Sequence, residues 1–179
     1  LNALKKLGMK YEIKKGYIYA NTKGKLEGAK IRFSKISVGA TENTIIAACL
    51  ANGITTLRNC AIEPEIVDLI NFLKSGGAKI KFVGKRTLKI EGIKSLKSTS
   101  YAVMSDRIEA GTFCVAACLT GGNLKINNLN PKVIKTELTL LKKVGAKIKT
   151  SKKQIHIIGP KKIKNISNLV TKEYPNFPT

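Results

Sequence analysis

The segment F-L-K-S-G-G at residues 72–77 decides the fold, because versions of it recur along the chain. L-K-K-L-G at 4–8 and L-L-K-K-V-G at 140–145 also place apolar residues at helical spacing before a glycine. Glycine readily takes the left-handed backbone conformation that ends many helices. We therefore predict three helix ends, which mark an internal repeat of about 69 residues.

Each of these markers is followed by a pair of predicted strands. Residues 9–13 with 17–20, 78–83 with 87–91, and 146–150 with 154–158 alternate apolar and polar residues around a short polar turn. One complete copy adds a strand at 30–33, a helix at 41–51, a strand at 55–60 and a helix at 64–74. The next copy repeats the plan with 101–104, 108–119, 124–126 and 131–144. The pattern predicts βαβαββ units in a layered α/β fold, because the period exceeds that of the usual solenoid repeats.

Composition sets wider bounds. The 179 residues are 43% hydrophobic, which is enough for the core of one large or two small domains. No apolar run is long enough to cross a bilayer, and the start shows no signal-peptide pattern. Because Leu1, Leu4 and Leu7 already follow helical spacing, we expect the chain to be an internal part of a longer protein.

The net charge of +22 raises the question of a nucleic-acid partner. The charge is spread along the sequence, is nearly all lysine, and is not interleaved with aromatic residues that could stack on bases. We therefore predict a solvated surface and no nucleic-acid partner. A noncatalytic basic module that binds RNA, an anionic surface or a nucleotide sugar is the alternative from a different functional class.

The cysteines do not form a recognisable metal or catalytic motif. Cys49, Cys60, Cys114 and Cys118 lack C-x-x-C spacing, and His156 is not grouped with them, so we predict no metal site. Cys49 and Cys118 lie in identical A-A-C-L segments of predicted helices, where a reduced cysteine packs as a small apolar side chain. Cys114 and Cys118 share a helical face, but nothing basic lies beside them to create a thiolate nucleophile.

The clearest candidate site is K-I-S-V-G-A-T-E-N at residues 35–43, where a basic strand end runs through Ser and Gly into an apolar helix. The first N–H groups of a helix lack internal partners and lie at the positive end of its dipole, which suits a phosphate. A Ser N-cap beside a solvated lysine explains the same residues, so both interpretations stay open here. At the corresponding helix start, Asp106 and Glu109 form an acidic capping box that would repel a phosphate. Arg107 could pair with an Asp or Glu close by in the sequence or face a cleft, and we expect the structural pairing.

Three segments together resemble a known family. S-V-G-A-T-E-N at 37–43, E-P-E-I-V-D at 63–68 and D-R-I-E-A-G-T-F at 106–113 are similar, in order and spacing, to UDP-N-acetylglucosamine enolpyruvyl transferases of the EPSP synthase-like superfamily. The resemblance spans the chain but covers only the middle of the family. It implies two similar domains, each an inside-out α/β barrel of three βαβαββ copies. Residues 1–104 would be the latter part of the first domain, and residues 105–179 the beginning of the second.

The resemblance also implies a reaction. Phosphoenolpyruvate would donate its enolpyruvyl group to the 3-hydroxyl of UDP-N-acetylglucosamine with release of phosphate, the first committed step of peptidoglycan synthesis. That places the protein in cell wall biogenesis, cell shape, cell division and the cell cycle, in the bacterial cytoplasm. It implies no cofactor, no metal and no membrane partner, and a monomer when full-length.

The family's binding residues can be matched at a few positions only. Lys35, Ile36, Ser37, Val38 and Gly39 match the segment that binds the uridine diphosphate, and Thr179 matches a Thr beside the sugar. The family's base-like Asp would be the next residue. Its Lys-Asn pair, phosphate-binding arginines and Gly-rich Cys loop lie outside this sequence, so we expect no catalytic residue within it and no activity from this segment alone.

Overall fold

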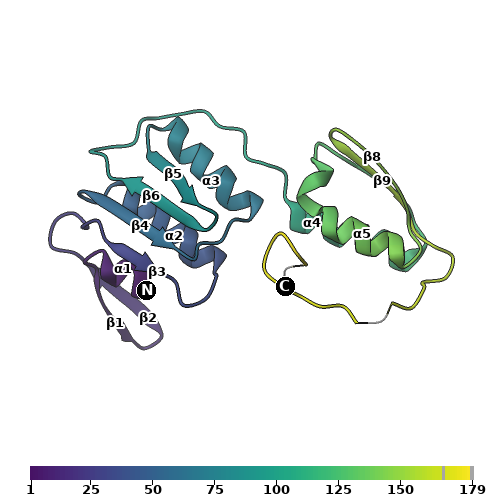
Figure 1. Cartoon of the computed structure of the whole chain (residues 1–179), viewed down its shortest axis with the longest axis horizontal. Helices are drawn as coiled ribbons and strands as arrows, with labels where there is room; N and C mark the ends of the chain where they lie inside the picture. Colours follow the sequence, from purple (N-terminus) through teal and green to yellow (C-terminus); the bar gives the residue numbers. More distant parts are fainter. Residues whose placement is uncertain (167, 178–179) are drawn as a thin grey trace. The chain divides into compact units, whose positions relative to one another are not determined.

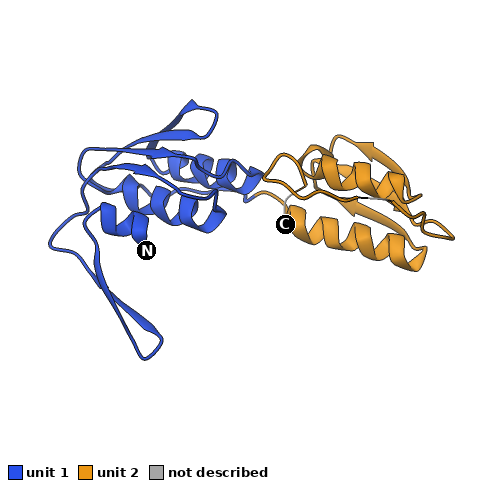
Figure 2. Cartoon of the chain, turned by 60° about the horizontal axis from the view of Figure 1, so that its bottom comes forward, with its two compact units in different colours: residues 1–103 blue, residues 104–179 orange. Residues whose placement is uncertain are grey.

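The computed structural model describes residues 1–166 and 168–177, which form two compact units, Leu1–Val103 and Met104–Thr179 (Figure 2). This division falls one residue before the boundary expected at residues 104 and 105. The assignment of the units to two domains of a longer protein stays a prediction. Each unit has its own hydrophobic core.

Unit 1 is built on a four-stranded sheet with the order β3-β4-β6-β5 (Figure 1). The neighbours β3 and β4 are parallel, whereas β6 is antiparallel to both β4 and β5. Helices α2 and α3 pack against each other and against the sheet. The bounds are β3 Lys30–Arg32, α2 Val38–Cys49, β4 Ile54–Arg58, α3 Pro64–Ser75, β5 Lys79–Gly84 and β6 Thr87–Glu91. The order β3-α2-β4-α3-β5-β6 confirms the predicted βαβαββ unit.

The core of unit 1 follows from the alternation of apolar residues in these elements. Ile45 of α2, Leu57 of β4, Ile66 of α3 and Leu88 and Ile90 of β6 are fully buried. Each large aliphatic side chain removed from water contributes about 1.5–3 kcal/mol. The sheet and the two helices are therefore held together mainly by apolar packing.

The glycine-marked helix ends share one backbone geometry. Gly8, Gly77 and Gly145 have φ of 100°, 99° and 109°, as predicted for left-handed helix ends. In each case the next residue donates its N–H to the carbonyl five residues before it, and the glycine donates to the residue three before. This is the Schellman arrangement. It ends α1 (Asn2–Lys6), α3 and α5 (Lys135–Lys143), and a hairpin follows each time.

Unit 2 repeats most of this plan. Its sheet has the order β7-β9-β8, which matches β4-β6-β5 of unit 1. Asn59 and Asn128 both follow a strand with φ of 61°, a conformation that asparagine tolerates better than most residues. The elements of unit 2 are α4 Arg107–Thr120, β7 Asn123–Asn127, η1 Pro131–Ile134, α5, β8 Lys147–Ser151 and β9 Gln154–Ile158. The hairpin after α1 in unit 1 consists of β1 Lys10–Lys14 and β2 Tyr17–Asn21.

The strand predicted at residues 101–104 is wrong, because this segment has no regular secondary structure. Tyr101 is instead tied to α3 of unit 1. Its hydroxyl bonds the Oδ1 atom of Asp68 at 2.9 Å, and its ring lies 5.5 Å from that of Phe72. These contacts hold Tyr101 against α3.

Two predicted helix boundaries also need correction. Helix α2 begins at Val38 rather than at residue 41, because the Ser37 hydroxyl caps it. The helix predicted at 131–144 is a 3-10 turn, η1, followed by α5. Asn130 caps η1, and Ile134, whose φ of −125° and ψ of 31° depart from helical values, separates the two pieces.

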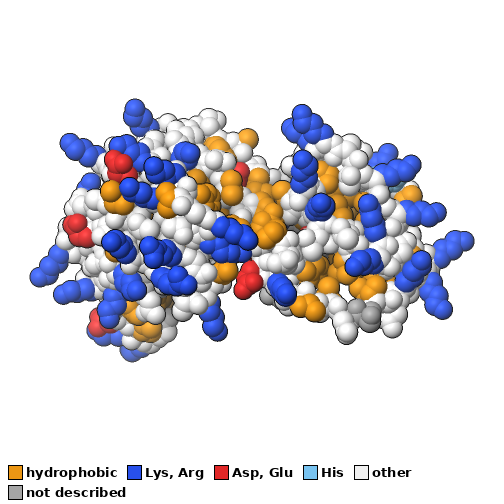
Figure 3. Space-filling view, viewed as in Figure 1, with side chains coloured by type: hydrophobic (Ala, Val, Ile, Leu, Met, Phe, Trp, Pro, Cys, Tyr) orange, Lys and Arg blue, Asp and Glu red, His pale blue; other side chains and the backbone are white. Residues whose placement is uncertain are grey.

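Basic side chains are spread over the face of each unit seen in Figure 3, with few acidic residues between them. The charges on this face do not gather into one patch. Within the described residues, no helix is long and apolar enough to cross a membrane.

Candidate functional site

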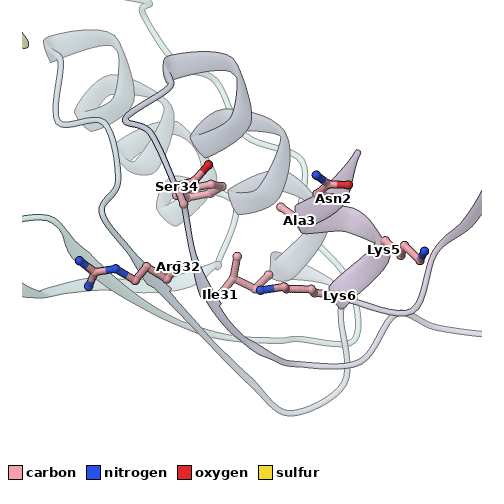
Figure 4. A pocket seen from close by; sticks show the side chains of 8 residues that line it. Asn2, Ala3, Lys5, Lys6, Ile31, Arg32 and Ser34 are labelled. Atoms are coloured by element: carbon pink, nitrogen blue, oxygen red, sulfur yellow. The ribbon is translucent and has the colours of Figure 1, made fainter.

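A groove in unit 1 runs between α1 and the loop that joins β3 to α2. It consists of two adjoining hollows of about 510 and 550 Å³. Asn2 and Ala3 of α1 and Phe33 and Ser34 of the loop line both hollows. Figure 4 shows the first hollow, with α1 on one side and Ile31, Arg32 and Ser34 on the other. The groove is therefore formed by segments that lie far apart in the sequence.

The loop is held in place by the parallel strand pair beneath it. The Phe33 N–H donates to the Arg58 carbonyl at 3.1 Å, which extends the β3–β4 pairing by one residue. The Asn59 side chain donates from Nδ2 to the Phe33 carbonyl at 3.0 Å. Because Asn59 sits in the left-handed region, its side chain can turn back to reach this neighbouring strand end. The loop thus leaves the sheet at a fixed point.

The first turn of α2 faces the groove. The Ser37 Oγ atom accepts a hydrogen bond from the Ala40 N–H at 3.2 Å, so Ser37 is the N-cap. The N–H groups of Val38 and Gly39 lie ahead of the first intrahelical bond and have no partner inside the helix. They lie at the positive end of the helix dipole. The N-cap and anion-site interpretations are therefore compatible, because they use different N–H groups.

A buried hydroxyl joins this helix start to the loop after β4. Thr41 is fully buried; its Oγ1 atom donates to the Ser37 carbonyl at 2.8 Å and accepts from the Ala61 N–H at 3.0 Å. A buried N–H that lost this acceptor would keep its desolvation cost without a hydrogen bond. Thr41 thus fixes the first turn of α2 in relation to β4.

The groove is electropositive. Lys5 and Lys6 of α1, Arg32 of β3 and Lys35 of the loop line it, and no acidic residue does so in the part of the chain that the structure describes. Lys35 is exposed and forms no ion pair within the described residues. Of these cations only Lys35 lines the same hollow as the first turn of α2, and a cation beside a helix N-terminus attracts an anion, with modest strength at an exposed site.

The structure brings together most of the sequence-predicted site residues. Lys35, Ser37 and Gly39 line the groove. Ile36 and Val38 are partly buried and pack on the core of unit 1, so a ligand would meet their backbone rather than their side chains. Thr179 lies outside the described residues.

The corresponding start of α4 is capped by an acid. Asp106 accepts from the N–H groups of Ile108 and Glu109 at 2.7 and 3.1 Å through Oδ1. Arg107 is 5% exposed and lies 3.8 Å, Nη1 to Oε1, from Glu137 of α5. The Asp106 cap and the structural pairing of Arg107 are confirmed, although its partner comes from another helix. The N–H groups of Ile108 and Glu109 are therefore already bonded to Asp106 and are not available to a phosphate.

Sequence reasoning missed the α1 side of the groove and the role of Thr41. The contact between α1 and the loop brings together residues about 30 positions apart, which no local periodicity reveals. Thr41 could have been recognised from its position, because it carries a hydroxyl four residues after the Ser37 N-cap on the buried side of an apolar helix.

All four cysteines are buried and free, as predicted. Burial raises the pKa of Cys49, Cys60 and Cys114 to about 11. Thiols in this state are poor nucleophiles at neutral pH. Among the described residues there is no cluster of three or more His, Cys, Asp or Glu side chains that could hold a metal ion.

The raised pKa values predict a loss of stability in alkali. In the unfolded chain these thiols ionise near their ordinary value of 9.0, whereas in the folded protein they stay protonated up to about 11. The stability that the buried neutral thiols contribute to the folded protein is therefore complete below pH 9 and is lost as the pH rises to about 11. Urea unfolding from pH 8 to 11 should show this decline, and it should be shallower in Cys49→Ala. An equal slope in both proteins would contradict the assignment.

Comparison with known protein families agrees with this fold. Residues 1–179 match the family described as EPSP synthase (3-phosphoshikimate 1-carboxyvinyltransferase), and the chain belongs to this family. Within the family it is similar to two proteins named UDP-N-acetylglucosamine 1-carboxyvinyltransferase. One, from Pelagibacter ubique, is 61% identical, and another, from Ruthia magnifica, is 50% identical, both over the whole of this chain. The chain spans only 43% and 42% of their lengths.

Solved structures agree on the fold. The enolpyruvyl transferase NikO from Streptomyces tendae matches with a TM-score of 0.74 and 19% identity, over 89% of this chain and 41% of its own. EPSP synthase from Acinetobacter baumannii matches with a TM-score of 0.63 and 22% identity, over 92% and 40%. At these identities the likeness shows the fold alone. It confirms the predicted enolpyruvyl transferase-like α/β fold, of which this chain holds a part.

Proposed function

We propose that the chain is part of a UDP-N-acetylglucosamine 1-carboxyvinyltransferase. Such an enzyme transfers the enolpyruvyl group of phosphoenolpyruvate to the 3-hydroxyl of UDP-N-acetylglucosamine and releases phosphate. The observation that carries the proposal is the basic groove at the start of α2, in a chain that is 61% identical to a protein with this name. The groove supplies a site for the nucleotide part of the acceptor.

The geometry of the groove suits a diphosphate. Lys35 brings a full positive charge to the loop, and the N–H groups of Val38 and Gly39 offer donors at the helix start. Hydrogen bonds between these groups and phosphate oxygens would be charge-assisted. The Ile36 backbone, between Lys35 and Ser37, completes the contact segment. Lys5 and Lys6 add long-range attraction for an anionic ligand.

The wider biological assignment is part of the same proposal. The reaction belongs to peptidoglycan synthesis and hence to cell wall biogenesis, cell shape, cell division and the cell cycle, and we place it in the bacterial cytoplasm. The partners are the two small-molecule substrates, without a nucleic acid or a membrane, and we expect the full-length protein to be a monomer. Thr179 is proposed to lie beside the sugar. No cofactor is needed, since the reaction is an addition and an elimination.

Phosphate release tests the proposal. The full-length protein should release phosphate from phosphoenolpyruvate only when UDP-N-acetylglucosamine is present, because attack by the sugar hydroxyl starts the sequence. Shikimate 3-phosphate is the critical control, because the family is described by the enzyme that uses it. Turnover with shikimate 3-phosphate and none with the nucleotide sugar would sink the proposal.

Gly39→Ala separates a ligand contact from a helix-start role. Gly39 lies in the first turn of α2, and an added Cβ would meet nothing within 4 Å. Alanine should therefore leave stability unchanged or raise it by about 0.5–1 kcal/mol. The methyl group would face the groove and should lower affinity for UDP-N-acetylglucosamine. Melting temperature and calorimetric affinity measured together check this, and unaltered affinity would place the nucleotide elsewhere.

A further inference from the structure

The buried arginine of unit 2 is used neither by the hydrophobic core nor by the groove of unit 1. Arg107, at the first position of α4, is 5% exposed. Its Nη1 atom lies 3.8 Å from Oε1 of Glu137, and its Cζ atom lies 5.5 Å from the ring centre of Tyr174. Burial of a guanidinium is costly unless charge and hydrogen-bond partners compensate for it. Glu137 and Tyr174 are two of the contacts that offset the cost of burying Arg107.

The third member of this group belongs to a segment without helix or strand. In the described residues after β9, the chain has no regular secondary structure, so side-chain and turn contacts must hold it. Within residues 172–177, the Lys172 N–H donates to the Phe177 carbonyl at 3.0 Å, and the Asn176 N–H donates to the Glu173 carbonyl at 3.1 Å. The segment is thus folded back on itself.

Two contacts join this turn to the helices of unit 2. The Thr136 hydroxyl of α5 donates to the Pro175 carbonyl at 3.0 Å. The guanidinium of Arg107 faces the ring of Tyr174, and a planar guanidinium is the side-chain cation best suited to such stacking. The Oε1 atom of Glu137, next to Thr136, lies 3.8 Å from the Nη1 atom of the same guanidinium. Arg107 and Thr136 therefore anchor neighbouring residues of the turn.

We propose that Arg107 is a positioning residue that, through Glu137 and Tyr174, anchors the turn at 172–177. The consequence for catalysis rests on the proposed function, which puts Thr179 beside the sugar; the anchoring itself does not. Thr179 follows Phe177 by two positions in the sequence, so a loosened turn would weaken the sugar contact that the proposed function assigns to it. Binding of UDP-N-acetylglucosamine would then suffer more than binding of phosphoenolpyruvate.

Hydrogen exchange in the full-length protein tests the anchoring. In Arg107→Met and Tyr174→Leu, amides of residues 172–177 should exchange about tenfold faster than in the unaltered protein, because local opening costs less. Amides of β8 and β9 in the same unit should be unchanged. Arg107→Lys keeps the charge but loses the planar guanidinium, so exchange at residues 172–177 in this variant should lie between that of the unaltered protein and that of Arg107→Met. Unaltered exchange at 172–177 in both Arg107→Met and Tyr174→Leu would overturn the anchoring.

Steady-state kinetics on the same variants test the consequence. We expect the KM for UDP-N-acetylglucosamine to rise about tenfold in Arg107→Met, with a KM for phosphoenolpyruvate that changes less than twofold. If the two KM values rise equally, or if neither changes, the positioning role is overturned even if hydrogen exchange at residues 172–177 is faster. If the unaltered protein does not use UDP-N-acetylglucosamine at all, the proposed function fails, while the exchange result still decides the anchoring.

Discussion

Lys35→Ala in the full-length protein should weaken UDP-N-acetylglucosamine binding by about 1–3 kcal/mol, the scale of a lost charge-assisted hydrogen bond. This is roughly a 5- to 150-fold increase in Kd. Lys35 is exposed and forms no ion pair within the described residues, so the melting temperature should not change. Isothermal titration with the nucleotide sugar and thermal unfolding of the same samples provide both readouts.

Two cap variants are the matched controls for Lys35→Ala. Ser37→Ala removes the acceptor for the Ala40 N–H and should lower stability by about 1 kcal/mol, with a smaller loss of affinity than Lys35→Ala. Asp106→Ala removes the cap of α4 and should lower stability by a similar amount without changing affinity. Unchanged affinity for Lys35→Ala would remove the loop from the binding site. Affinity lost equally in all three would indicate a general effect of destabilisation.

Thr41→Val should lower the free energy of unfolding by about 1–3 kcal/mol, although valine has nearly the same shape. The substitution removes the acceptor of the Ala61 N–H, which lies in a fully buried position, and the donor to the Ser37 carbonyl. Urea unfolding of the full-length protein measures the effect.

Thr41→Ser keeps the hydroxyl and serves as the control. The Ala61 amide should stay protected from hydrogen exchange in Thr41→Ser and lose protection in Thr41→Val. A Thr41→Val protein as stable as the unaltered one would show that the buried hydroxyl is dispensable. Because Thr41 belongs to the S-V-G-A-T-E-N segment, this experiment also separates the structural from the binding residues of that motif.

The repeat could be predicted because its determinants are local. Gly8, Gly77 and Gly145 each end a helix through a backbone conformation that glycine adopts readily, and the following strands alternate with a period of two. The same local logic identified the Asp106 cap and the burial of the cysteines. These features depend on a few neighbouring residues, which a sequence displays directly.

The errors concern contacts between segments that are distant in the chain. Residues 101–104 have the composition of a strand, but Tyr101 is held by Asp68 and Phe72 of α3, about 30 positions earlier. The groove likewise depends on α1, which approaches the loop at Lys35 only after folding. Local patterns found the loop and its helix, and tertiary packing supplied the other wall.

A crystal structure of the full-length protein with bound UDP-N-acetylglucosamine tests the central claim most directly. The account predicts diphosphate oxygens within hydrogen-bond distance, about 3 Å, of the Lys35 Nζ atom and of the Val38 or Gly39 N–H group. The Ser37 hydroxyl should lie beside the same phosphate. A diphosphate bound elsewhere, with the groove between α1 and the β3–α2 loop filled only by water, would contradict it.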